Sequence, residues 1–153
     1  MTHDSLPRTA LVVFVDQTEC PWLRVLRRGF RHCFAAVSDG SSWIVCDPLK
    51  DRMEINLLRL PADFDLAGFY AGKGYEVLIG HVRRVPCRDR LTLAPLTCVA
   101  VVKRILGLRA MCVLTPRQLF CHLRNARDGA FLRYGVESAA VPAEINFSLD
   151  TFS

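Results

Sequence analysis

The chain has 153 residues, of which 51% are hydrophobic, and its formal net charge is +5 at pH 7. This length fits one domain with a substantial core, and the hydrophobic share argues against extensive disorder. The apolar runs at 11–15 and 99–102 are far shorter than the ~18 residues of a membrane span. The first eight residues lack the basic and apolar regions of a signal peptide. We therefore expect a cytoplasmic protein with no membrane span.

The positive charge comes mainly from arginine, which clusters at 24–31 and 83–90. Such clusters are typical either of a surface that binds a polyanion or of an ordinary solvated surface. Neither aromatic residues interleaved with basic ones nor zinc-finger spacing accompanies them. We therefore do not expect nucleic acid as the partner.

The seven cysteines are odd in number and include no Cys-x-x-Cys pair. This spacing argues against a zinc ribbon and against a framework of disulfides. The local pairs His32-Cys33 and Cys121-His122 also lack the spacing of metal ligands. We expect no metal and no cofactor, and most of the cysteines should be small buried hydrophobic residues.

In chain order, the first half of the sequence predicts short strands and little helix. Apolar runs and alternating apolar and polar residues carry this prediction. The expected elements are strands at 11–15, about 30–37, about 42–47 and 52–58, with one or two helical turns at 21–28.

The second half predicts three helices and one further strand. Proline, aspartate and threonine mark the expected helix starts, and glycine marks their ends. The expected elements are a helix that Pro61 and Asp63 open and that Gly72 and Gly74 close, a strand at 75–85, a helix from Pro95 to Leu106, and a helix with Thr115 as N-cap and Pro116 as first residue. We expect residues 1–135 to form a single domain and the polar tail 136–153 to pack on that domain or on a partner.

The dipeptide Asp39-Gly40 sets the expected register of the hairpin. Asp-Gly between apolar strands favours a two-residue type I′ turn, because both central residues need φ > 0. In this register His32 faces Asp47, and on the other side of the hairpin Cys33 faces Cys46. Opposed Cβ atoms lie about 4.5–5.5 Å apart, so an imidazole and a carboxylate at these positions can hydrogen-bond.

A histidine held by an aspartate needs only a nucleophile to complete a triad, and Cys98 is the candidate. It falls in the first turn of the helix expected after Pro95. There, free backbone N–H groups and the helix dipole lower the pKa of a thiol and can stabilise an oxyanion. Trp43 shares the expected face of His32 and is a candidate to line the substrate cleft.

Each of these residues also has a purely structural interpretation. Cys98 can be a core thiol on the buried face of its helix, and His32 can bind Asp47 for stability alone. Trp43 can be a core aromatic residue. The sequence leaves these alternatives open.

The order of three segments resembles the circularly permuted branch of the NlpC/P60-like, papain-fold cysteine hydrolases. The segments are Phe30-Arg31-His32-Cys33-Phe34, Ile44-Val45-Cys46-Asp47-Pro48 and Leu96-Thr97-Cys98-Val99-Ala100-Val101-Val102-Lys103. Permuted members place the histidine strand before the cysteine helix. The resemblance implies a papain-like α+β fold with a central antiparallel sheet flanked by helices. It also implies Cys98 as nucleophile, His32 as general base and acid, and Asp47 as the residue that orients the imidazole.

These features together predict a thiol hydrolase of the amidase or peptidase type, which acts on a peptide, amide or ester through an acyl-enzyme. The alternative is a catalytically inactive papain-like domain that serves as a structural or interaction module, with the tail 136–153 as a contact. The compact, arginine-rich chain is similar in style to bacterial and phage proteins, so such a module could be carried in a virion. A third hypothesis, a nucleic-acid-binding module, predicts binding that weakens steeply with salt.

Overall fold

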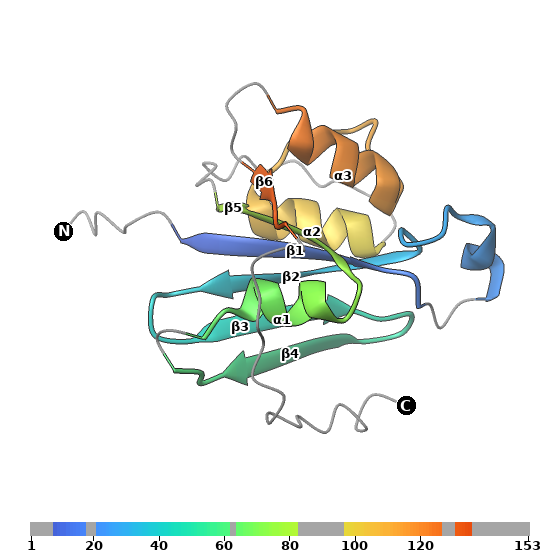
Figure 1. Cartoon of the computed structure of the whole chain (residues 1–153). Coiled ribbons are helices and arrows are strands. Elements are labelled where there is room, and N and C mark those ends of the chain that lie inside the picture. The colour runs from blue at the N-terminus through green and yellow to red at the C-terminus, as the bar shows by residue number, and fades with distance from the viewer. Residues whose placement is uncertain (1–7, 18–20, 62–63, 83–96, 127–130, 136–153) are drawn as a thin grey trace.

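The computed structural model describes residues 8–17, 21–61, 64–82, 97–126 and 131–135. These residues form an α+β fold in which a six-stranded antiparallel sheet carries helices on both faces (Figure 1). The strands are β1 (Thr9–Val15), β2 (His32–Ser38), β3 (Trp43–Pro48), β4 (Met53–Leu58), β5 (Glu76–His81) and β6 (Phe131–Arg133). The helices are η1, a 3-10 helix (Pro21–Val25), and the α-helices α1 (Leu66–Gly72), α2 (Cys98–Leu106) and α3 (Pro116–Arg124).

The sheet has the strand order β4-β3-β2-β1-β5-β6, so the first four strands are neighbours in chain order. From the edge strand β4 the chain passes through α1 and returns as β5, which pairs with β1. β1 is an interior strand, and one of two core clusters covers each of its faces. This explains why its residues are apolar without alternation. The expected α+β class, with a central antiparallel sheet flanked by helices, is confirmed.

Two hydrophobic clusters lie on opposite faces of the sheet. Val12 and Phe14 of β1 pack with residues of α2 and α3. Their neighbours Leu11 and Val13 pack with residues of α1 on the other face. The alternation of side chains along β1 thus assigns α2 and α3 to one layer and α1 to the opposite layer.

The register of the β2–β3 hairpin differs from the expected one. Ser38 pairs with Trp43 and Ala35 with Cys46, so each residue of β2 meets a partner two positions further along than the Asp39-Gly40 turn would give. Asp39 instead closes the turn, since its N–H donates to the carbonyl of Ser42 at 3.2 Å. The expected opposition of His32 to Asp47, and of Cys33 to Cys46, is therefore wrong as a statement of register.

The physical reason for the shift lies in the turn itself. Gly40 has φ of +97°, and within the described residues positive φ occurs only at glycines. A type I′ turn centred on Asp39-Gly40 would require a positive φ at Asp39 as well. The Asp39 carboxylate accepts hydrogen bonds from the N–H groups of Ser41 and Ser42 at 2.9 and 2.8 Å. These bonds favour Gly40-Ser41 as the central pair.

A shift of two residues keeps every side chain on its expected face, because the side chains of a strand alternate with a period of two. His32 and Asp47 thus still share one face of the hairpin, with Phe34 and Val45. Cys33 and Cys46 still share the other face, with Ala35. The partners are diagonal rather than directly opposed.

The start of one helix agrees with the sequence and the starts of two differ. Helix α1 begins at Leu66 with Asp65 as N-cap, so the expected start at Pro61 and Asp63 is wrong. Helix α3 begins at Pro116 with Thr115 as N-cap, as expected, and a capping box with Gln118 completes its start. Helix α2 begins at Cys98 with Thr97 as N-cap, so the expected start at Pro95 is wrong. The strand β6 was not expected, and the tail 136–153 lies outside the described residues.

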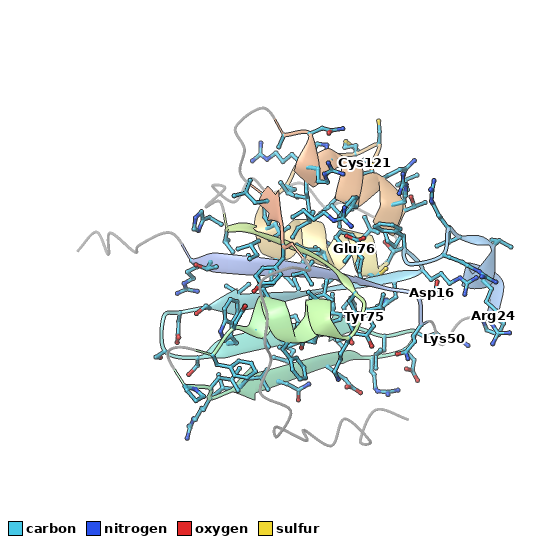
Figure 2. The ribbon with its side chains drawn as sticks, viewed as in Figure 1. Asp16, Arg24, Lys50, Tyr75, Glu76 and Cys121 are labelled. Carbon is cyan, nitrogen blue, oxygen red and sulfur yellow. The ribbon has the colours of Figure 1, made fainter. Side chains whose placement is uncertain are left out.

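The connection between β1 and β2 is fastened just ahead of His32. The carboxylate of Asp16 accepts a hydrogen bond from the Gly29 N–H at 2.7 Å and pairs with the Arg31 guanidinium at 3.4 Å. Arg31 also donates to the carbonyl of Arg24 in η1 at 3.2 Å. Figure 2 shows Asp16 and Arg24 at the end of the sheet where β1 stops. These contacts fix the direction in which the chain enters β2.

Candidate active site

His32 and Asp47 meet across the open end of the β2–β3 hairpin. The ring Nε2 of His32 lies 2.6 Å from Oδ1 of Asp47. In the observed register Asp47 is level with Phe34, two residues from His32, so the contact is a diagonal one. Backbone pairing of β2 with β3 ends at Ala35, so the side chains bridge strands that have already parted.

A second carboxylate lies beside this pair. Glu54 of β4 is the direct cross-strand neighbour of Asp47, and opposed like charges are unfavourable. The Glu54 carboxylate is engaged by Arg52, whose Nε lies 3.0 Å from it. Arg52 thus relieves the repulsion and leaves Asp47 to bind His32.

Cys98 is the first residue of α2, and its thiol meets the start of β2. Thr97 caps the helix: its hydroxyl oxygen accepts the N–H of Ala100 at 3.2 Å. The side chains of His32 and Cys33 and the backbone N–H of Cys33 influence the ionisation of the Cys98 thiol, so these groups lie near it. The Cys98 side chain is half-buried and packs against the core cluster beneath α2. Imidazole and carboxylate are therefore in contact, and the thiol of Cys98 lies near the imidazole.

The surroundings of Cys98 stabilise its thiolate. The hydrogen bond from the Cys33 thiol is the largest influence, and burial opposes it. The hydrogen bond and positive charge of His32, together with the Cys33 N–H, add to the first effect and lower the pKa of Cys98 to about 5. A thiol with this pKa is ionised at neutral pH.

The surroundings of His32 favour its protonated form. Burial alone would lower the pKa of the imidazole. The hydrogen bonds to Asp47 and Cys98, with the negative charges of both, outweigh burial and raise the pKa of His32 to about 9. Between these two values the pair exists as thiolate and imidazolium, the charge state that a cysteine nucleophile and its acid need.

Cys33 is the member of this group that sequence reasoning missed. It is fully buried in the cluster beneath α2, and its thiol influences the ionisation of Cys98. The side chain of Cys98, together with burial, raises the pKa of Cys33 well above its ordinary value. Adjacency to His32 in the sequence could not reveal this, because consecutive strand residues project to opposite faces.

Trp43 is not brought to this group. It is level with Ser38, six residues along β2 from His32, which corresponds to about 20 Å at the rise of a strand. The Trp43 side chain packs against the cluster on the α1 face. Its position near the turn makes it part of the core rather than of the Cys98 surroundings.

The five described cysteines are free thiols. Cys33, Cys46, Cys98, Cys112 and Cys121 form no disulfide, and Cys20 and Cys87 lie outside the described residues. Among the residues that the structure describes, His, Cys, Asp and Glu side chains do not gather in groups of three or more that could hold a metal ion. Nor does this part of the chain contain a helix that is long and apolar enough to cross a bilayer.

The sequence matches no family model and no curated protein, and the fold matches no solved structure. The chemistry of the site is therefore argued from its own geometry.

Proposed function

We propose that the protein is a thiol hydrolase of the amidase or peptidase type, with a permuted papain-like arrangement of its catalytic residues. The observation that carries this proposal is the 2.6 Å contact of His32 with Asp47 near the Cys98 thiol, with the sulfur at the start of a helix. A structural histidine needs a partner for its ring but not a half-buried thiol near it. The order of histidine strand, aspartate strand and cysteine helix agrees with the permuted members of the papain-like class.

The first half of the reaction forms an acyl-enzyme. The Cys98 thiolate attacks the carbonyl carbon of an amide, thioester or ester, and the electron pair of the C=O bond moves onto oxygen. Thr97 occupies the N–H of Ala100, so we assign the remaining first-turn amides, those of Cys98 and Val99, to the stabilisation of the oxyanion. As the tetrahedral species collapses, His32 donates its proton to the leaving amine, thiol or alcohol.

The second half releases the acid. Neutral His32 takes a proton from water, the resulting hydroxide attacks the thioester carbonyl, and the Cys98 thiolate leaves. Asp47 engages Nε2 of the ring throughout, so Nδ1 is the nitrogen that exchanges the proton. Asp47 thereby holds the ring orientation and stabilises the imidazolium.

The proposal is tested by trapping the acyl-enzyme. Purified protein is incubated near pH 7 with a panel of nitrophenyl esters, thioesters and fluorogenic amides, and acyl adducts are located by peptide mass spectrometry. We expect an adduct at Cys98, and turnover that falls by about three orders of magnitude or more in Cys98→Ala.

The matched control is Cys46→Ala, because Cys46 is a half-buried cysteine on the neighbouring strand. This variant should keep the adduct and the turnover. Adducts spread evenly over several cysteines, or turnover that survives Cys98→Ala, would reject the hydrolase.

A second candidate function, an inactive papain-like module used for assembly, is favoured by one feature. Met53, Ile55 and Leu57 of the edge strand β4 project on the same face as Ile44 of β3 and are exposed. Large exposed apolar patches are typical of interaction surfaces. This candidate predicts that Ile55→Asp changes the mass of the protein measured in solution, whereas Cys98→Ala changes nothing that can be measured. The hydrolase predicts instead that Cys98→Ala abolishes turnover and that Ile55→Asp leaves turnover unchanged.

A further inference from the structure

Strand β4 lies at one edge of the sheet, and among the described residues its only strand neighbour is β3 (Figure 1). Alternate residues of β4, namely Met53, Ile55 and Leu57, are 42%, 63% and 56% exposed. They project on the same face as Ile44 of β3, which is exposed as well. Natural edge strands are commonly protected by lysine, proline or a bulge, and β4 has none of these. β4 therefore has the properties of a strand that pairs with another chain.

The turn between β3 and β4 shows which backbone groups of β4 point away from the sheet. The Leu49 N–H donates to the carbonyl of Arg52 at 2.9 Å, so these two residues form a hydrogen-bonded pair. Such pairs alternate with non-hydrogen-bonded pairs along an antiparallel ladder, so the even-numbered residues of β4 bond to β3. The N–H and C=O groups of Met53, Ile55 and Leu57 therefore point outward from the edge.

The sequence of β4 is self-complementary about Ile55. In an antiparallel pair of two copies centred there, Ile55 faces Ile55 of the second copy, and Met53 faces Leu57 of the second copy. These are the residues whose backbone groups point outward, so the two strands meet in hydrogen-bonded pairs. Opposed side chains lie on one face of a sheet, so the exposed apolar residues of both copies form one continuous row.

The charges near β4 agree with the same register. Continued two residues beyond Met53, the register places Asp51 opposite Arg59 of the second copy, and two-fold symmetry repeats this ion pair. Glu54 faces Asn56 of the second copy and not another carboxylate. A shift by two residues sets Glu54 against itself or separates Asp51 from Arg59, and a shift by one sets apolar side chains against polar ones. The pairing about Ile55 is therefore favoured over its neighbours.

We propose that the protein forms a two-fold symmetric dimer in which the β4 strands of two copies pair antiparallel about Ile55 and join two sheets into one. The partner at this apolar edge is thus a second copy of the chain. The dimer goes beyond the proposed hydrolysis, because β4 supplies none of the three catalytic residues. The interface is built mainly from one short strand and is small, so the dimer should dissociate on dilution.

The first test is the mass of the full chain, measured by analytical ultracentrifugation over a series of concentrations. We expect the mass to rise with concentration to that of two chains, and a mass of one chain at every concentration would overturn the proposal. Ile55→Asp sets two negative charges against each other at the centre, so the dissociation constant should rise by about tenfold or more.

The matched control is Leu132→Asp, because Leu132 is 70% exposed on β6, the other edge strand of the sheet. This variant should associate as the unmodified protein does. A dimer that is lost in Leu132→Asp and kept in Ile55→Asp would overturn the proposal.

Exchange of charges tests the register. Asp51→Arg and Arg59→Asp each set like charges opposite one another in the dimer, so each should raise the dissociation constant by about threefold to tenfold. The double variant restores opposite charges and should restore the original dissociation constant. These two residues flank opposite ends of β4, so recovery requires contact between copies. A double variant that associates more weakly than either single variant would overturn the pairing about Ile55.

Amide hydrogen exchange distinguishes strand pairing from other contacts. The outward N–H groups of Met53, Ile55 and Leu57 should exchange about tenfold or more slowly at high protein concentration than at low. The N–H groups of Glu54 and Asn56, which bond to β3, should be protected at both. Protected outward amides in a protein with the mass of one chain would place another segment of that chain on β4. A dimer with unprotected outward amides would associate through another surface, and either result overturns the proposal.

None of these measurements involves turnover, so the dimer and the hydrolase can fail separately. An acyl-enzyme formed by a protein that never exceeds the mass of one chain would reject the dimer alone. A dimer with the expected exchange pattern and no acyl-enzyme would reject the hydrolase alone.

Discussion

The two ends of the β2–β3 hairpin are built by different kinds of interaction. At the turn, Asp39 makes its hydrogen bonds to Ser41 and Ser42, its near neighbours in the chain. At the open end, His32 binds Asp47, fifteen residues away, and its pKa is influenced by Cys98, which lies on another element. The turn is exposed and its contacts are local, whereas the open end is half-buried and its contacts are long-range.

The turn fixes how the two strands pair, whereas the open end determines how its side chains ionise. The turn sets which residues of the two strands pair, and it does so with uncharged backbone groups and one solvated carboxylate. The open end brings together three ionisable side chains whose pKa values depend on one another. A substitution at the turn should therefore change stability, and a substitution at the open end should change ionisation.

The largest expected effect is that of His32→Ala on the ionisation of Cys98. In the unmodified protein, the rate at which iodoacetamide alkylates Cys98 should rise with pH around a midpoint near 5, the pKa of its thiol. Removing the imidazolium removes a hydrogen bond and a positive charge, so the midpoint should rise by about two units. The hydrogen bond from Cys33 remains, which keeps the midpoint below that of a free thiol.

The control for this experiment is His81→Ala, because His81 is an exposed histidine at the end of β5. Its alkylation profile should coincide with that of the unmodified protein. A midpoint in His32→Ala that also coincides would show that the imidazole does not ionise the thiol.

A smaller effect is expected from Asp47→Asn on the pKa of His32. The aspartate raises that pKa through a hydrogen bond and its charge, and burial acts in the opposite direction. Without the negative charge, the pKa of about 9 should fall by about one unit or more. Nuclear magnetic resonance of the imidazole C–H signals against pH measures the change directly.

Glu54→Gln is the matched control, since it removes one negative charge at the residue directly opposite Asp47. Glu54 is paired with Arg52, so the pKa of His32 should change by less than about half a unit. Equal shifts in the two variants would mean that the net charge of this region, and not the 2.6 Å contact, controls the histidine.

Sequence patterns foretold the elements whose signals are local. Thr115 and Pro116 marked the start of α3, because capping and the fixed φ of proline act within one turn of helix. The β2–β3 hairpin was expected at the right place, but the turn centre was displaced by one residue. The side-chain hydrogen bonds of Asp39, which favour the alternative centre, cannot be ranked from the sequence alone.

Contacts between distant segments were harder to foresee. The three-residue strand β6 depends on pairing with β5 and on the bond from Nε of Arg133 to Glu76 at 2.8 Å, fifty-seven residues away. The proximity of Cys33 to Cys98 depends on how α2 packs over β2. The grouping of His32 and Asp47 was inferred from a hairpin register that is wrong by two residues, and it survives because a shift of two keeps both side chains on one face. Cys98 was added from the chain order and from its expected place in the first turn of a helix.

The smallest expected effect is at the turn, where Gly40→Ala should lower the free energy of unfolding by about 1 kcal/mol. Gly40 has φ of +97°, a region that disfavours any residue with a Cβ, and there is open space around the position. The cost is therefore one of backbone conformation alone, and urea denaturation measures it.

Gly135→Ala is the control, because Gly135 also has open space but lacks a positive φ, so stability should be unchanged or slightly raised. The alkylation midpoint of Cys98 should be the same in both variants as in the unmodified protein, since the turn follows Ser38, which lies six residues along β2 from His32. A midpoint that moves with Gly40→Ala would show that the two ends of the hairpin are coupled, and that the register set at the turn also determines the ionisation of the thiol.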